Sequence, residues 1–205
     1  MIVIVDYDAG NLTSVKRALD FLEIDSKITP DPKQIIEAER VIFPGVGHAS
    51  TAMDILRNRG IDTALREVFR KGTPLMGICL GTQIILSESE EGKTSCLGLL
   101  DGLCPKFSLK NSALKVPHMG WDSIRFVRPH PVLEGVLPTD EFYFVHSYFP
   151  QPADMRDVIG FCEYEIDFPA VIGRNNLFAT QFHPEKSGQA GLRILKNFST
   201  WDGKL

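Results

Sequence analysis

The chain has 205 residues, of which 43% are hydrophobic and 23% are charged, and its formal net charge is −4. This composition predicts one globular domain over residues 1–205 with a sizeable core. The sequence has neither a basic stripe nor an apolar run of membrane-spanning length, which argues against a nucleic-acid or membrane partner.

The cysteines carry no sign of a metal or disulfide framework. Cys79, Cys96, Cys104 and Cys162 form no CxxC pair and no zinc spacing. The chain starts with the apolar run Ile2–Val5, which is typical of a strand and lacks the basic start of a signal peptide. We therefore expect a reduced protein in the cytoplasm.

Strand and helix patterns alternate through the first half of the chain. Ile2–Val5 is a continuous apolar run, as in a strand buried on both faces. The loop Asp6–Asn11 follows, Asn11 or Thr13 can cap the next helix, and apolar residues then recur at helical spacing. Next we expect a strand at 24–29, a helical turn after Asp31, a strand at 41–43, and a helix over 53–68 broken near Gly60.

The strand at 41–43 runs into Pro44-Gly45-Val46-Gly47. Two glycines after a strand leave backbone N–H groups free to face a site. For these four residues taken alone, an ordinary turn is the favoured interpretation.

The next apolar run ends in Gly77-Ile78-Cys79-Leu80-Gly81, before a second apolar segment. Strand, sharp turn and helix with glycines two before and two after a nucleophile are typical of a nucleophile elbow. Such a turn places Cys79 at a helix N-terminus, which favours thiolate, and offers the Leu80 N–H to an oxyanion. A buried core cysteine is the alternative.

A second cluster, His183-Pro184-Glu185, lies about a hundred residues later. Residues two apart in an extended backbone point to the same face, and Pro184 favours that conformation. Glu185 can then orient the imidazole of His183 and stabilise its charged form. Cys79, His183 and Glu185 would together make the nucleophile, base and orienter of an acyl-transfer site.

Glycine, proline and short β-prone runs dominate the second half. The candidate strands are residues 103–109, 123–127, 142–145, 158–164, 170–172 and 177–181, before a closing helix over 192–198. Residues 115–121 hold two breakers, and we expect a loop in which Trp121 either marks an interface or caps the core. The predicted fold is an α/β fold with an open, mostly parallel sheet between helices and added antiparallel strands in the C-terminal half. The site should lie at the carboxyl ends of the central strands.

These motifs resemble those of the class I (triad) glutamine amidotransferases. The blocks are DYDAGN (6–11), PGVG (44–47), GICLG (77–81), KVPHMGW (115–121), FYFVHSY (142–148) and ATQFHPEKSG (179–188). Within that class the chain is similar to the glutaminase subunits of imidazole glycerol phosphate synthases. It departs from their usual pattern at Asp8, His48, Thr82 and Asp122.

The resemblance implies further roles. The Val46 and Leu80 N–H groups would form the oxyanion hole. Four residues would contact bound L-glutamine: Gln83, Glu91, Ser147 and Tyr148. Four more would meet a cyclase (β/α)8-barrel subunit in a heterodimer: Asn11, Trp121, Tyr143 and Lys186. The reaction would release glutamate and ammonia through a Cys79 thioester, with no metal or organic cofactor.

Three alternatives stay open from the sequence. The chain could serve another ammonia-using synthase, act as a different cysteine hydrolase such as a peptidase, or be a regulatory subunit without catalysis. The intact Cys79, His183 and Glu185 argue against the last of these.

Overall fold

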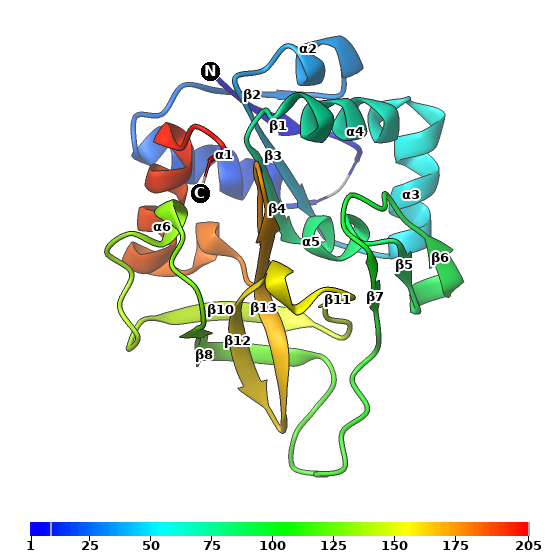
Figure 1. The fold of residues 1–205 in the computed structure, drawn as a ribbon, viewed down its shortest axis with the longest axis vertical. Coiled ribbons are helices and arrows are strands. Elements are labelled where there is room, and N and C mark those ends of the chain that lie inside the picture. Colours follow the sequence, from blue (N-terminus) through cyan, green and yellow to red (C-terminus); the bar gives the residue numbers. More distant parts are fainter. Residues whose placement is uncertain (9, 205) are drawn as a thin grey trace.

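A computed structural model describes residues 1–8 and 10–204; Ala9, in the predicted loop 6–11, lies outside them. Within these residues eight strands form one sheet in the order β2-β1-β3-β4-β14-β13-β12-β9 (Figure 1). Their bounds are β1 Ile2–Val5, β2 Ser26–Thr29, β3 Arg40–Gly45, β4 Leu75–Cys79, β9 Arg125–Phe126, β12 Val158–Tyr164, β13 Ile166–Arg174 and β14 Leu177–Thr180. The neighbours from β2 to β14 pair in parallel, and β13, β12 and β9 extend the sheet antiparallel. The predicted fold class is confirmed.

Helices cover both faces of this sheet. They are α1 Leu12–Phe21, α2 Pro32–Ile36, α3 Ala49–Asn58, α4 Ile61–Lys71, α5 Leu80–Ile84 and α6 Gly188–Thr200. Residues alternate along each strand, so Val3 and Val5 pack in a core with α3, α4 and α5, whereas Ile2 and Ile4 pack in a core with α1 and α6. Figure 1 shows α1 and α6 on one side of the sheet and α3 and α4 on the other. Burial on both faces explains why these strands are continuous apolar runs.

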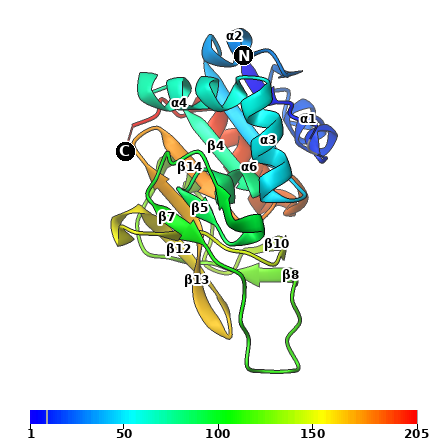
Figure 2. The same cartoon turned by 90° about the vertical axis from the view of Figure 1, so that its right-hand side faces the viewer.

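Two small sheets complete the architecture (Figure 2). One pairs β8 (His118–Ser123) with β10 (Glu141–His146). The other has the order β11-β7-β5-β6, with bounds Gln151–Pro152, Gly102–Cys104, Glu88–Ser89 and Thr94–Ser95. Short 3-10 helices lie between these elements: η1 Glu91–Lys93, η2 Pro131–Leu133, η3 Met155–Asp157 and η4 Pro184–Lys186.

Three expectations about elements were wrong. Residues 118–121 form the first four of the six residues of β8 and not a loop, because β8 pairs with β10 along its whole length and Gly120 takes a φ of 154° that suits glycine. The strand expected over 103–109 covers only Gly102–Cys104. The expected cap of α1 is absent among the described residues: Asn11 holds the N-cap position, but its side chain makes no capping hydrogen bond.

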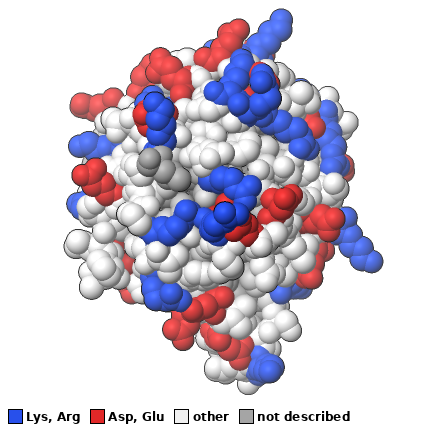
Figure 3. Space-filling model, in the orientation of Figure 1, with Lys and Arg blue, Asp and Glu red and all other residues white. Residues whose placement is uncertain are grey.

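Other local expectations hold. Asp31 caps α2 by accepting a hydrogen bond from the Lys33 N–H at 2.9 Å. Gly60, with a φ of 70°, separates α3 from α4. None of the described helices is long and apolar enough to cross a membrane. On the face seen in Figure 3, basic and acidic side chains are interspersed.

Candidate active site

Cys79 stands at the turn between β4 and α5. Its φ of 54° is left-handed, which costs an L-residue energy and marks a sharp strand-to-helix turn. The turn requires Gly81, because a β-carbon there would lie 2.0 Å from the Phe43 carbonyl oxygen. Close packing of α5 on β3 therefore fixes where the thiol points, and Cys79 is only 6% exposed.

His183 and Glu185 follow β14, the strand beside β4. Their side chains are fully buried, and His183 Nδ1 lies 2.7 Å from Glu185 Oε1. Asn11 Nδ2 donates a hydrogen bond to the same carboxylate oxygen. Sequence reasoning missed this contact, since nothing in the spacing links Asn11 to Glu185.

The charges around His183 set its protonation. Burial lowers the pKa of His183, but the neighbouring Cys79 sulfur and Glu185 carboxylate outweigh burial and raise it to about 10. His183 Nε2 makes no hydrogen bond within the described residues, so the ring nitrogen beside the thiol is free. Catalytic contacts are often loose in the ligand-free state and tighten when substrate binds. The raised pKa favours the proton on the imidazole of His183.

Amide side chains complete the surroundings of the sulfur. Gln181 Nε2 lies 3.7 Å from Cys79 Sγ, and Gln83 Nε2 donates to Gln181 Oε1 at 3.1 Å. Gln181 was not among the predicted site residues. Its position immediately before Phe182-His183 is the signal that could have found it, because β14 ends there beside β4.

The residues predicted for the oxyanion hole lie beside the thiol. Gly45 at the end of β3 pairs with Cys79 at the end of β4, which brings Val46 next to the turn. Leu80 is the first residue of α5, so its N–H has no acceptor within the helix. Gly47 has a φ of 106°, and Val46 is 37% exposed.

A pocket of 240 Å³ opens beside Cys79. Its lining includes these predicted residues: Val46, Cys79, Leu80, Gln83, Glu91, Ser147 and Tyr148. Gln83 Nε2 is already bonded to the Tyr148 carbonyl at 2.8 Å and to Gln181, so only Gln83 Oε1 remains to accept a hydrogen bond from a ligand. Glu91 Oε2 accepts from the Ala49 N–H at 2.7 Å and so caps α3 at the rim.

Comparison with known proteins decides the family. The family model "Glutamine amidotransferase class-I" matches residues 3–200.

The chain belongs to the class-I glutamine amidotransferase family.

Named relatives cover nearly the whole chain. The imidazole glycerol phosphate synthase subunit HisH of Desulfovibrio desulfuricans is 49% identical over 203 residues, covering 97% of this chain and 93% of the relative. The protein of the same name from Moorella thermoacetica is 47% identical over 198 residues, covering 96% and 93%.

Solved structures support the fold alone. A crystal structure of a glutamine amidotransferase has a TM-score of 0.73 at 19% identity, covering 96% of each chain. The structure of PurLQS from Thermotoga maritima has a TM-score of 0.71 at 18% identity, also covering 96% of each.

The residues predicted for a partner interface of this amidotransferase divide into two groups. Trp121 on β8 and Tyr143 on β10 have ring centroids 5.9 Å apart, and the Lys186 ammonium lies 5.8 Å from the Tyr143 ring centroid. These three side chains form one row, which we call the aromatic row. Asn11 lies instead against Glu185.

The four departures from the usual family pattern each make local contacts. Asp8 pairs with Arg59, His48 Nδ1 accepts from the Ser50 N–H at 3.3 Å, the Thr82 hydroxyl donates to the Thr180 carbonyl at 2.6 Å, and Asp122 lies 2.7 Å from His118. Among the described residues there is no group of three His, Cys, Asp or Glu side chains that could hold a metal ion.

Proposed function

We propose that the chain is the glutaminase subunit of an imidazole glycerol phosphate synthase. It hydrolyses L-glutamine to glutamate and ammonia, and a cyclase (β/α)8-barrel subunit, joined to it as a heterodimer, consumes the ammonia in histidine biosynthesis. The names of relatives 47% and 49% identical over nearly the whole chain support the assignment. Such biosynthetic enzymes work on cytoplasmic metabolites, and we place the protein in the cytoplasm.

The observation that carries the proposal is the 2.7 Å contact between Glu185 and His183, whose pKa the sulfur of Cys79 raises, while Cys79 itself lines the pocket. His183 takes the thiol proton, and the thiolate attacks the side-chain amide carbon of glutamine. The charge on the tetrahedral oxygen rests on the N–H groups of Val46 and Leu80. One such donor is worth about 3–4 kcal/mol in the transition state.

The second half of the reaction reverses the proton flow. The imidazolium of His183 gives its proton to the leaving nitrogen, so ammonia departs and a glutamyl thioester stays on Cys79. Water, deprotonated by His183, then attacks the thioester and releases glutamate. Glu185 does no covalent chemistry: its contact of 2.7 Å holds Nδ1–H and leaves Nε2 free to exchange a proton with the thiol.

Substrate contacts follow from the free hydrogen-bonding groups of the pocket. Gln83 Oε1 can accept from the α-amino group of glutamine, and Glu91 provides a carboxylate for the same charge. Ser147 and Tyr148 also line the pocket. Glu91 also caps α3, so its carboxylate is held in place before substrate arrives.

Replacement of Cys79 tests the assignment. Cys79→Ala, assayed with the barrel subunit, should abolish glutamine-dependent turnover and leave turnover with added ammonium intact, because only the ammonia supply is lost. Cys104→Ala is the matched control, since this buried thiol lies in β7 and should leave glutamine use unchanged. Glutamine-dependent turnover by Cys79→Ala would contradict the nucleophile assignment.

The other candidate functions predict different results. A glutaminase of another synthase would release glutamate without serving this barrel, and a peptidase would cleave peptides and spare glutamine. A non-catalytic subunit would not be labelled at Cys79 by a glutamine-derived electrophile.

A further inference from the structure

A chain of hydrogen-bonding groups runs from the surface of β8 to the wall of the pocket. Asp122 Oδ2 lies 2.7 Å from His118 Nε2, and His118 Nδ1 lies 3.1 Å from His146 Nε2. His146 Nδ1 lies 2.8 Å from the carbonyl oxygen of Tyr148, which lines the pocket. The imidazoles are 1% and 5% exposed, whereas the Asp122 side chain is 39% exposed.

The two ends of this chain fix the number of protons that it needs. An ionised carboxylate and a peptide carbonyl only accept hydrogen bonds. His118 Nε2 must therefore carry a proton toward Asp122, and His146 Nδ1 must carry one toward Tyr148. The central contact between the two rings needs one proton more. Three protons on two imidazoles make one positive charge, which balances the carboxylate of Asp122.

Any arrangement with only two protons leaves one close contact between two lone pairs. If His118 Nδ1 keeps a proton, its Nε2 lone pair faces the carboxylate at 2.7 Å; if His146 Nε2 keeps one, its Nδ1 lone pair faces a carbonyl at 2.8 Å. If both outer protons stay, two lone pairs meet at 3.1 Å between the rings. Buried polar groups without partners are costly, so each choice is unfavourable.

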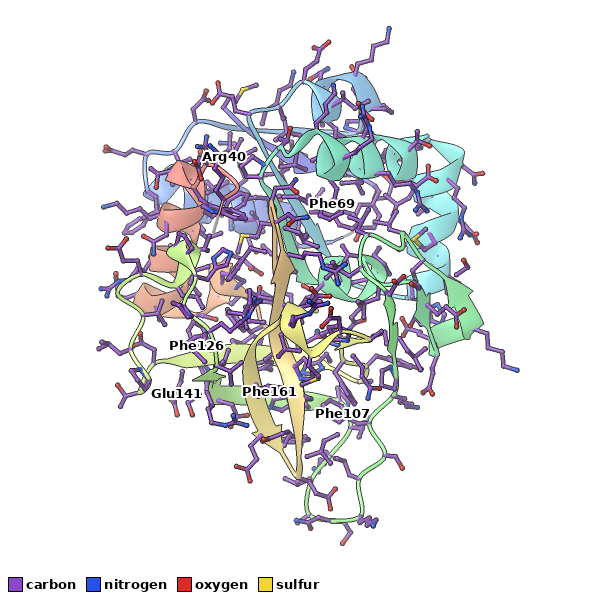
Figure 4. The ribbon with its side chains drawn as sticks, in the orientation of Figure 1. Arg40, Phe69, Phe107, Phe126, Glu141 and Phe161 are labelled. Atoms are coloured by element: carbon purple, nitrogen blue, oxygen red, sulfur yellow. The ribbon has the colours of Figure 1, made fainter. Side chains whose placement is uncertain are left out.

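Burial opposes the third proton, and Asp122 is the group that can retain it. Burial lowers the pKa of both rings, to about 3 for His146; on His118 Asp122 acts in the opposite direction but does not outweigh burial, so the hydrogen-bond count along these groups carries the case for the third proton. The pair is otherwise enclosed by aromatic rings, among them Phe107, which Figure 4 labels. The extra charge therefore belongs on His118, the ring in contact with the carboxylate.

No other nearby group among the described residues supplies negative charge. Tyr164 on β12 stacks on His118 with centroids 4.1 Å apart, and its hydroxyl donates to the Lys115 carbonyl. Burial raises the pKa of Cys162, also on β12, so this thiol is neutral. His183 acts on His146 as a further positive charge and disfavours a second proton there.

The chain continues into the site through the Tyr148 carbonyl. This oxygen also accepts from Gln83 Nε2 at 2.8 Å, and Gln83 in turn bonds Gln181, which contacts the Cys79 sulfur. Losing the hydrogen bond from His146 would free the Tyr148 carbonyl to move and release Gln83, the residue with one free acceptor for substrate.

We propose that Asp122, His118 and His146 share one extra proton at neutral pH and act as positioning residues for the glutamine pocket. As a statement about glutamine binding, this rests on the proposed function. Asp122 and His118 lie outside the lining of the pocket; His146 lies in that lining and acts by holding the Tyr148 carbonyl.

Nitrogen NMR of the histidine rings tests the shared proton directly. In the full chain labelled with ¹⁵N-histidine, we expect His118 to carry protons on both nitrogens at pH 7. Asp122→Asn keeps an acceptor oxygen and removes the charge, so His118 should lose its second proton at a pH at least about one unit lower, a tenfold change in the protonation equilibrium. Asp167→Asn removes an exposed carboxylate paired with Arg125 and should leave the His118 signal unchanged.

Kinetics then tests the positioning role. With the barrel present at pH 7.5, Asp122→Asn should raise KM for glutamine about fivefold, or about 1 kcal/mol, and change kcat much less. The KM of the unmodified protein should rise at high pH, as His118 loses its proton. Two neutral rings at pH 7 in the unmodified chain would overturn the proposal, as would an unchanged KM and His118 signal in Asp122→Asn. The NMR signal does not depend on turnover. If the His118–His146 pair is charged but the protein does not hydrolyse glutamine, the proposed function is refuted and the shared proton is not.

Discussion

The Tyr7 hydroxyl is buried against the turn after β3, with no hydrogen-bond partner in the described part of the chain. A β-carbon on residue 45, which is glycine, would lie only 1.9 Å from this hydroxyl oxygen. Burial and the neighbouring Cys79 raise the pKa of the phenol. A buried, unpaired hydroxyl costs about 1–3 kcal/mol. Tyr7→Phe should therefore leave the free energy of unfolding unchanged or raise it, measured by urea denaturation.

Tyr164→Phe is the control for this change. The Tyr164 hydroxyl donates to the Lys115 carbonyl at 2.9 Å, so its removal should cost about 1 kcal/mol. A loss of stability in Tyr7→Phe as large as that in Tyr164→Phe would mean that the Tyr7 hydroxyl has a partner in solution.

Glu185 affects the reaction through the pKa of His183. Because the carboxylate helps to raise that pKa to about 10, Glu185→Gln should lower it. Protonated His183 is the acid for the leaving ammonia, so the alkaline limb of the pH–rate profile should move to lower pH. The rate should fall less than in Cys79→Ala, for which losses of a thousandfold or more are typical of triad members. An alkaline limb that does not move would contradict this role.

At the residue scale, the sequence predicted contacts and turns that form within a short stretch of backbone. His183 and Glu185 are two apart and do make the expected contact, and Cys79 lies at the expected turn. The contacts of Asn11 with Glu185 and of Gln181 with Cys79 join segments more than a hundred residues apart. The position of Gln181 just before Phe182-His183 is the one local signal for either residue, and the contacts themselves required the structure.

At the scale of elements, α5 depends on its close approach to β3. A β-carbon on Gly81 would lie 2.0 Å from the Phe43 carbonyl oxygen, which is backbone and cannot swing away. Gly81→Ala should therefore push α5 from the sheet and destabilise the fold by several kcal/mol, about 3 or more. Thermal unfolding and glutaminase activity should both report the change.

Gly60→Ala separates packing from backbone strain. Gly60 has a φ of 70°, but nothing lies within 4 Å of a β-carbon there. Only the left-handed conformation opposes alanine, at about 1–2 kcal/mol. Equal losses from the two substitutions would show that the contact with Phe43 does not matter.

Strands were predictable where their own side chains are buried on both faces. β1, β3, β4 and β14 are mostly apolar, and each lies where the sequence predicted a strand. β8 was missed because its burial alternates and Gly120 lies in its middle. Its pairing with β10, far along the chain, makes it a strand.

At the scale of the whole molecule, the proposed partner surface is tied to the proposed catalytic base. The Tyr143 carbonyl accepts from the His183 N–H at 3.0 Å, and the Tyr143 N–H donates to the Ser187 hydroxyl at 3.0 Å. Tyr143 also belongs to the aromatic row with Trp121, which is 50% exposed. A partner that binds the aromatic row therefore contacts β10, the strand whose Tyr143 carbonyl accepts the hydrogen bond from the His183 N–H.

Binding of a partner can also affect the site through the turn after β3, which contains Val46. Val46 is 37% exposed, and the glycines on each side let its peptide rotate at low steric cost. A partner that binds best when the Val46 N–H faces the thiol would favour that state, and one oxyanion donor is worth about 3–4 kcal/mol. The free chain should therefore be a poor glutaminase.

Glutamate release should rise stepwise, by about tenfold or more, from the free chain to the chain with the barrel and then to the pair with its nucleotide substrate, each tenfold being about 1.4 kcal/mol.

Trp121→Ala should weaken barrel binding about tenfold or more, as expected of an exposed aromatic anchor. Once the barrel is saturating, this variant should recover most of the activation. Phe21→Ala removes a side chain that is 72% exposed at the opposite end of α1 from Asn11, and should bind the barrel normally. Equal rates in all three mixtures would mean that the oxyanion hole is already formed in the free chain.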